Sequence, residues 1–324
     1  MRTLVVGPGA VARAVTRALS DSGTEVALLD EVPASNYPGE LVLGCGQWDP
    51  DEEVDVARAV LKSRSSYVSA SRDPDNVGAL LSLDEEAKEQ GSSVVCGMSW
   101  TPGLTNLMVT MGLTQVPAPW KVSVSWVVPP SAATLPWVAA ALSGTTAVFS
   151  EGSWRRVEAG GSPEKVYLPE PVGWKTVRVA RGAEAVTIPR HSDVTEVIVR
   201  GGSGRRVADR LIERVSDAAE LGRSSKSDHL SRLAGLAANL IAGRGDKAGW
   251  VAIRVDVKGT DDRVTLGVLE HASNLATAPL IAAAQLIGQG APKPGAWTPE
   301  QILEPRDVFE AISKRGVRIA KLIR

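Results

Sequence analysis

The first third of the chain alternates short apolar runs with stretches of helical periodicity. The runs that predict strands are Thr3–Val6, Glu25–Leu29, Glu40–Leu43, Tyr67–Ala70 and Ser93–Cys96. Apolar residues recur at helical spacing over Ala10–Ser20, Glu52–Lys62 and Val77–Gln90. Short strands that alternate with helices are typical of a parallel sheet with right-handed crossovers. We therefore predict a Rossmann domain, a doubly wound α/β fold, over residues 1–117.

After residue 117 the pattern changes from long helical spacing to alternation of apolar and polar residues. The segments "KVSVSWVV", "TVRVA" and "VTEVIVR" alternate as half-buried strands, and "WVAIRVDVKGTDDRVTLGVLE" predicts a hairpin with its turn at Gly259–Asp262. Helical patterns lie near residues 137–142, 205–220 and 229–242, and again over most of 276–324. We predict a second, α+β domain over residues 118–275 with a mixed, largely antiparallel sheet, and C-terminal helices of 276–324 that complete the Rossmann domain.

Composition and charge narrow the classes of partner. The 324 residues are 44% hydrophobic with a net charge of −1, which fits two domains with ample core. Residues 1–117 carry 8 Lys and Arg against 16 Asp and Glu, and the remainder carries 28 against 21. A basic remainder could serve an anionic small-molecule substrate, and the alternative is a solvated surface with some attraction between the domains. We expect no nucleic-acid partner, because basic clusters with interleaved aromatics are missing.

The same reading predicts a cytoplasmic protein that forms a homodimer. No apolar run reaches the ~18 residues of a membrane span, so no membrane partner is expected. The short apolar run after Arg2 is interrupted by Arg13 and Arg17, which argues against a secretory signal. Cys45 and Cys96 both lie in apolar runs and are expected to be buried thiols in a reducing compartment.

A glycine-rich turn follows the first predicted strand and predicts a dinucleotide site. In Gly7-Pro8-Gly9-Ala10-Val11-Ala12 the first glycine allows the tight turn, the second lets a pyrophosphate approach, and Ala12 lets helix and strand pack closely. The helix start then presents N–H groups to the phosphates. Asp30, with Glu31 beside it, ends the second strand, where an acid binds the ribose hydroxyls. The acids favour NAD as the cofactor, and NADP is the alternative.

Ligands of a doubly wound sheet bind at the carboxyl ends of its strands. Further candidates for cofactor contact at this edge are Cys45, Gly46, Ser71 and Gly97, and Trp48 is a candidate to lie over the cofactor. The loop after the fifth strand, in "VVCGMSWTPGLTNLMVTMGL", offers polar groups that could line a substrate pocket: Trp100, Thr101, Thr105 and Asn106. The alternative is an ordinary loop in which Asn106 only starts a helix.

Several of these segments, in this order, resemble the saccharopine dehydrogenase-like family of NAD(P)-binding oxidoreductases. The resemblance rests on Pro-Gly-Leu-Thr-Asn at 102–106 and on "VLKSRSSYVSAS", "ALSGTTAVFSEGSWRRV" and "LATAPLIAAAQLIGQGAPKPGAWTPEQIL". It implies a Rossmann domain, a middle substrate domain with a cleft between them, and hydride transfer at a carbon bearing nitrogen in an opine-like or imine substrate. Only nine residues lie between Asp30 and Glu40, where larger relatives place an extra helix and strand.

Candidates for acid–base work are few. The candidate proton carriers are His271, with Asn274 one helical turn later, and His191. Arg190, beside His191, is a candidate clamp for a substrate carboxylate. Each histidine could instead be a solvent-facing side chain. The three tyrosines lack the Tyr-x-x-x-Lys spacing, and two cysteines with three histidines supply no zinc site, so we expect no metal. Two functions remain open: an NAD(P)-dependent dehydrogenase acting on CH–NH, or a nucleotide-binding sensor or assembly subunit without redox turnover.

Overall fold

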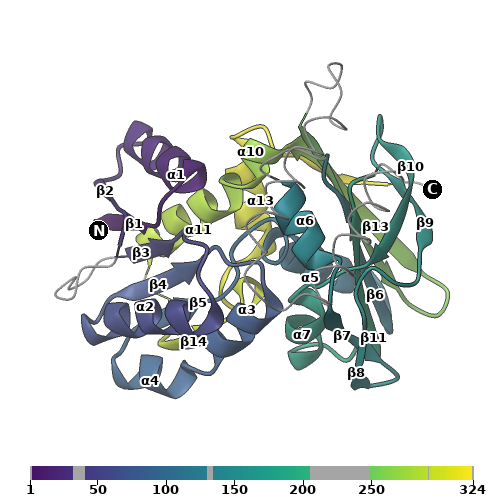
Figure 1. Cartoon of the computed structure of the whole chain (residues 1–324), viewed down its shortest axis with the longest axis horizontal. Coiled ribbons are helices and arrows are strands. Elements are labelled where there is room, and N and C mark those ends of the chain that lie inside the picture. The colour runs from purple at the N-terminus through teal and green to yellow at the C-terminus, as the bar shows by residue number, and fades with distance from the viewer. Residues whose placement is uncertain (1, 32–40, 130–133, 205–248, 291, 323–324) are drawn as a thin grey trace, which may run out of the picture. The chain divides into compact units, whose positions relative to one another are not determined.

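The structure is a computed structural model that describes residues 2–31, 41–129, 134–204, 249–290 and 292–322. The chain divides into two compact units (Figure 1). Unit 1 comprises Met1–Met111 and Ser273–Val317, and unit 2 comprises Gly112–Ala272 and Arg318–Arg324. The helices expected over 205–220 and 229–242 lie outside the described residues. Among the helices that are described, none is both long enough and apolar enough to cross a bilayer.

Unit 1 is built on a six-stranded parallel sheet in the order β14-β5-β4-β3-β1-β2. Its strands are β1 (Thr3–Val6), β2 (Val26–Leu29), β3 (Leu41–Gly44), β4 (Ser66–Ser69), β5 (Ser93–Val95) and β14 (Gly295–Trp297). The chain passes from β1 to β2 on one side, whereas β3 lies on the other side of β1. The strand order therefore reverses between β1 and β3, which is the switch point at which such sheets bind ligands. The predicted Rossmann fold is confirmed.

The helices of unit 1 pack with their apolar faces inward. They are α1 (Ala10–Asp21), α2 (Pro50–Lys62), α3 (Pro74–Leu81), α4 (Asp84–Glu89), α5 (Leu104–Leu113), α10 (Ala272–Leu275), α11 (Ala278–Gln289), α12 (Pro299–Ile302) and α13 (Pro305–Ser313). In α1, Ala12, Val15 and Leu19 are buried at helical spacing. Strands β1 and β3 are buried along their whole length, as expected of strands covered on both faces.

Unit 2 is built on a nine-stranded mixed sheet. Its main path is β15-β13-β12-β6-β11-β10-β9, and β7 pairs with β11 and β8. The strands are β6 (Lys121–Val127), β7 (Thr145–Ser150), β8 (Ser153–Glu158), β9 (Glu164–Leu168), β10 (Gly173–Val179), β11 (Glu196–Gly202), β12 (Trp250–Lys258), β13 (Arg263–His271) and β15 (Ile319–Lys321). The helices of this unit within the described residues are α6 (Leu135–Ala141), α7 (Glu184–Thr187) and the 3-10 helix η1 (Ile188–Arg190). Among the described strands of this sheet, β6 and β11 are the one pair that runs parallel, so the predicted, largely antiparallel sheet is confirmed.

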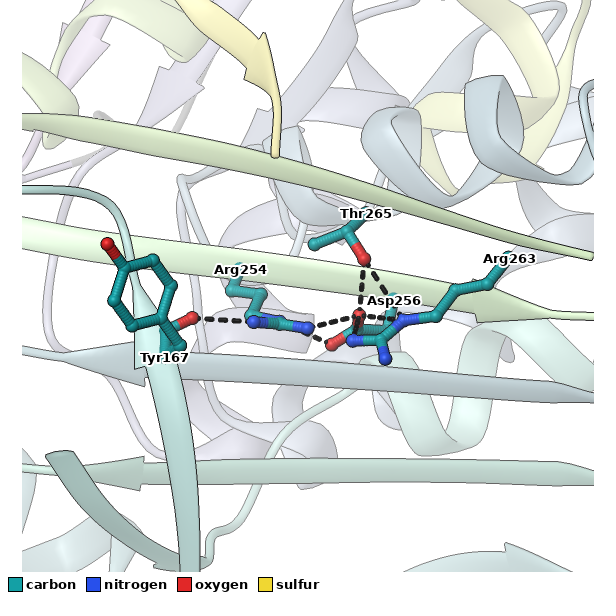
Figure 2. Close-up of polar contacts among 5 residues, drawn as sticks. All are labelled: Tyr167, Arg254, Asp256, Arg263 and Thr265. Atoms are coloured by element: carbon teal, nitrogen blue, oxygen red, sulfur yellow. Dashed lines mark hydrogen bonds and ion pairs between the residues drawn. The ribbon is translucent and has the colours of Figure 1, made fainter. Parts of the chain in front are cut away.

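The β12–β13 hairpin carries a buried ion cluster on one face (Figure 2). Arg254 donates to Asp256 through Nε at 2.7 Å and Nη2 at 2.8 Å, and its Nη1 donates to the Tyr167 carbonyl on β9 at 2.7 Å. Arg263 and Thr265, from β13, donate to the same Asp256 carboxylate. Arg254 and Asp256 are 6% and 7% exposed. Two guanidinium groups thus share one carboxylate and tie three strands together.

The C-terminal segment departs from the predicted helix. Helix α13 ends before Gly316, which has φ +90°, and the Val317 N–H donates back to the Ile312 carbonyl at 3.1 Å. A glycine in the left-handed region closes a helix in this way. The chain then forms β15, which pairs antiparallel with β13 in unit 2. The prediction that C-terminal helices complete the Rossmann domain is therefore wrong for residues 318–322.

Candidate functional site

The turn after β1 is locked against the loop after β3. The Gly7 N–H donates to the Leu29 carbonyl at 2.9 Å, and the Cys45 N–H donates to the Val6 carbonyl at 2.8 Å. Gly7 has φ +126°, and a Cβ placed on it would lie 2.5 Å from the Gly46 nitrogen. Only glycine fits there, because both the backbone conformation and the neighbouring backbone exclude a side chain.

Gly9, in contrast to Gly7, has open space around it. It has φ +111°, and a Cβ placed on it would meet nothing within 4 Å among the described atoms. Gly9 is also the N-cap of α1 and has no side chain to accept from the N–H groups of the first turn. Those N–H groups therefore have no side-chain cap from Gly9, and together with the positive end of the helix dipole they are suited to bind an anion. Ala12 is fully buried, as the close packing of helix and strand requires.

Asp30 and Glu31 follow β2 beside this turn. The hydrogen bond from Gly7 to Leu29 joins the turn to the end of β2, so that the next residue, Asp30, lies at the same sheet edge. Both acids are exposed. The turn and the acids thus occupy the positions that the sequence predicts for a pyrophosphate and a ribose site.

The loop after β3 contributes a thiol and an indole. Burial raises the pKa of the Cys45 thiol to about 12, so that the group stays protonated and acts as a small apolar side chain. The Trp48 ring lies on Gly46, since a Cβ on Gly46 would come within 2.3 Å of it. Trp48 therefore covers the backbone that packs against Gly7. Its place over a cofactor stays a prediction.

A buried carboxylate beneath this edge is a feature that sequence reasoning missed. Glu53, in the first turn of α2, is 2% exposed. Its Oε1 accepts from Ser69 at 2.5 Å and from Tyr67 at 3.2 Å, and its Oε2 accepts from Asn76 at 2.6 Å. Desolvation raises the pKa of Glu53, and these hydrogen bonds oppose the rise. Glu53 lies at helical spacing from the buried Ala57 and Val60, whereas Asp51 and Glu52 are exposed, so its place on the apolar face of α2 was the available signal in the sequence.

The loop after β5 is packed rather than open. Trp100, Thr101 and Thr105 are at most 3% exposed. The Met98 N–H donates to the Ser69 carbonyl at 2.6 Å, which joins this loop to the end of β4. The Arg72 guanidinium, which the sequence analysis overlooked, lies over the Trp100 ring at 5.9 Å, and burial lowers its pKa to about 10. The sequence could have indicated Arg72 as a site residue, because it lies three residues after the end of β4. Ser71 and Gly97 meet here too, since a Cβ on Gly97 would lie 3.5 Å from the Ser71 carbonyl oxygen.

Asn106 has contacts that fix the loop. It is 1% exposed, its Oδ1 accepts from the Gly103 N–H at 3.3 Å, and its Nδ2 donates to Glu300 on α12 at 2.7 Å. These contacts hold the β5 loop against α12. Contact of Asn106 with a substrate stays a prediction.

The remaining candidates are not gathered around the glycine turn within unit 1. His191, Arg190 and His271 belong to unit 2, and all three are exposed. The His271 ring stacks on Trp250 with ring centroids 3.9 Å apart. Asn274 is in unit 1, where its Nδ2 donates to the Arg315 carbonyl at 2.9 Å beside the end of α13. A role of either histidine as proton carrier stays a prediction.

A cavity of about 1150 Å³ lies at the opposite edge of the unit 1 sheet. Thr3, at the start of β1, and the α1–β2 loop line it together with α11 and α13. Because dinucleotides bind at the carboxyl ends of the strands, this cavity is separate from the candidate site. In the part of the chain that the structure describes, no three His, Cys, Asp or Glu residues are grouped to hold a metal.

No protein-family model matches the chain, and no curated protein matches it in sequence. Among solved structures, it is similar to apo saccharopine dehydrogenase (L-Glu forming) from Saccharomyces cerevisiae. The TM-score is 0.65 at 12% identity, over 99% of this chain and 100% of the yeast chain. The chain has the fold of saccharopine dehydrogenase. The resemblance inferred from the sequence is thereby confirmed for the fold.

Two further structures match at lower scores. An engineered D-amino acid dehydrogenase gives a TM-score of 0.44 at 12% identity, over 95% of this chain and 96% of its own. An oxidoreductase from Agrobacterium radiobacter, in complex with NAD+, L-tartaric acid and magnesium, gives 0.42 at 8% identity, over 99% and 98% of the two chains. Both scores are lower than that of the yeast protein.

Proposed function

We propose that this chain is an NAD-dependent oxidoreductase that transfers a hydride at a carbon bearing nitrogen in a small, amino-acid-derived substrate. The observation that carries the proposal is the glycine turn. Gly7 is closed in by backbone, whereas Gly9 is open and begins α1 at the switch point of the sheet. A turn that only linked a strand to a helix would not need open space at its second glycine.

The residues present fit a dinucleotide. The N–H groups of Gly9, Ala10 and Val11 would hold the pyrophosphate, since Pro8 has no N–H to offer. Asp30, with Glu31 beside it, would accept hydrogen bonds from the ribose hydroxyls, and their charge would repel the 2′-phosphate of NADP. When bound, NAD supplies the hydride acceptor and NADH the hydride donor. The protein's part is to bind, orient and exclude water.

The substrate class rests on two supports. The yeast protein whose fold this chain shares is named as a saccharopine dehydrogenase that forms L-glutamate, so its chemistry concerns an amino acid. The excess of basic residues after residue 117 favours a substrate that carries a carboxylate. Arg190 is the proposed carboxylate clamp, and His271 or His191 is the proposed proton carrier.

A turnover assay tests this proposal. The protein is incubated with NADH and a panel of 2-oxo acids, each paired with amino acids, while the absorbance of reduced nicotinamide is followed. We expect oxidation that requires both the oxo acid and the amine. Tight binding of NADH with no turnover across the panel would instead favour a nucleotide-binding protein without redox activity. Oxidation by an oxo acid alone would contradict the assignment to CH–NH chemistry.

A further inference from the structure

Glu53 is a buried carboxylate held by neutral donors. The hydroxyls of Ser69 and Tyr67 and the amide of Asn76 donate to its two oxygens at 2.5–3.2 Å. Among the described residues no Lys or Arg forms an ion pair with it. A carboxylate buried without a cation is costly, and the N-terminal turn of a helix offsets the cost only in part. An apolar residue would fill the same space at a lower cost in free energy, so stability alone does not explain a glutamate at this position.

The donors to Glu53 are also the anchors of the sheet-edge loops. The Asn76 amide that donates to Glu53 also donates to the Trp48 carbonyl at 3.1 Å. The Ser69 hydroxyl that donates to Glu53 accepts from the Ser71 N–H at 3.0 Å. One carboxylate therefore orients both a side chain that ties down the loop after β3 and a side chain that ties down the loop after β4.

The Trp48 end of this network reaches the glycine turn. The Trp48 indole lies on Gly46, and the Gly46 nitrogen lies 2.5 Å from where a Cβ on Gly7 would stand. The contacts run from Glu53 through Asn76, Trp48 and Gly46 to Gly7, all within unit 1. Tyr67 donates to the same carboxylate from within β4, and its ring packs on Gly44 at the end of β3, a contact that Tyr67→Phe keeps. Removing the Tyr67 hydroxyl therefore serves as the control for removing the other partners of Glu53.

We propose that Glu53 is a positioning residue for the dinucleotide site, which holds the Trp48 indole on Gly46 beside the glycine turn by orienting Asn76. The proposal rests on the proposed function, because it assigns Glu53 to the same site. Glu53 touches no reacting atom. Its effect passes through the shape of the loops, so its loss should weaken cofactor binding more than it disturbs the rest of the sheet.

The first test needs no cofactor. Hydrogen exchange of peptides that span residues 45–49 is compared in the wild type, Asn76→Leu, Glu53→Leu and Tyr67→Phe. We expect about tenfold faster exchange in the two Leu variants and wild-type exchange in Tyr67→Phe, because only the Leu variants release the Trp48 carbonyl. Asn76→Leu keeps the test decisive if Glu53→Leu fails to fold. Unchanged exchange in Asn76→Leu would overturn the proposal.

The second test measures NADH affinity with the same variants. We expect Asn76→Leu and Glu53→Leu to bind about tenfold more weakly, a loss of about 1.4 kcal/mol. Glu53→Gln should restore most of the affinity, because its carbonyl oxygen can still accept from Asn76 while its amide donates to the hydroxyls. If wild-type protein binds NADH, Gly9→Val does not and Asn76→Leu binds normally, this proposal alone is wrong. If wild-type protein fails to bind, the proposed function is wrong, and the positioning role in the site falls with it.

Discussion

At the scale of single residues, the two glycines of the opening turn have different reasons to be glycine. Gly7 is excluded from bearing a side chain by the Cys45–Gly46 backbone, whereas Gly9 faces open space with φ +111°. The sequence motif predicted both roles, because each follows from strand, turn and helix in a fixed order. The motif could not reveal the hydrogen bonds of Glu53, because its partners Tyr67, Ser69 and Asn76 come together only when the sheet forms.

Replacing Asp30 tests the choice of cofactor. Asp30→Ala should weaken NAD binding by about 1.5–3 kcal/mol, roughly tenfold to a hundredfold, because a charged hydrogen-bond acceptor is lost. The same change should narrow the gap between NAD and NADP, since the repulsion of the 2′-phosphate falls. Titrations of both cofactors into both proteins give the four dissociation constants. A wild type that prefers NADPH to NADH would remove Asp30 from the site.

Replacing Asn106 separates a structural from a catalytic role. Asn106→Ala removes the acceptor of the Gly103 N–H and the donor to Glu300 at a buried position. We expect the free energy of unfolding to fall by about 1–3 kcal/mol, with NADH affinity retained. Thermal melting and NADH titration on one preparation measure both. An unchanged melting temperature combined with a large loss of kcat would identify Asn106 as a substrate contact instead.

At the scale of elements, the predictions failed where an element is short or where a local bond outweighs the pattern. Strand β14 (Gly295–Trp297) has three residues, too few to show alternation, and joins the sheet only by pairing with β5. The helix expected over Val77–Gln90 divides into α3 and α4. The Ser82 hydroxyl donates to the Ala79 carbonyl at 2.6 Å at the break, a bond by which serine competes with the helix.

The β12–β13 hairpin supplies the prediction at this scale. Asp256→Ala leaves the buried Arg254 guanidinium without its carboxylate and should cost about 3–5 kcal/mol of unfolding free energy. Glu196→Ala breaks the more exposed pair with Lys121 and serves as the control, with an expected loss of about 1 kcal/mol or less. Denaturant unfolding of the two variants checks the difference. Equal losses would contradict the view that Asp256 organises the cluster.

At the scale of the whole molecule, the sequence predicted the two architectures and the sheet edge of the candidate site. The hydrophobic pattern predicts a parallel sheet followed by a largely antiparallel one. Strands buried on both faces are continuous apolar runs, whereas strands buried on one face alternate apolar and polar residues. The C-terminal strand β15 was not predicted, because its partner β13 lies about fifty residues earlier in the chain and no local pattern indicates that pairing. The grouping of His271, His191 and Arg190 with the glycine turn depends on long-range placement, which residue types alone cannot supply.

The most direct test of the central claim is a titration of the protein with NADH, followed by energy transfer from tryptophan to nicotinamide. The wild type is compared with Gly9→Val and with Gly23→Val. Gly23 also has positive φ and open space around a Cβ, but it lies beyond the far end of α1. Both variants add the same side chain at a positive φ. Because Gly9, with ψ −177°, lies in a region that essentially only glycine populates, thermal melting of each variant checks that its fold is kept. We predict saturable transfer in the wild type and Gly23→Val, and none in Gly9→Val. Saturable transfer of equal affinity in Gly9→Val would contradict the assignment of the glycine turn as a dinucleotide site.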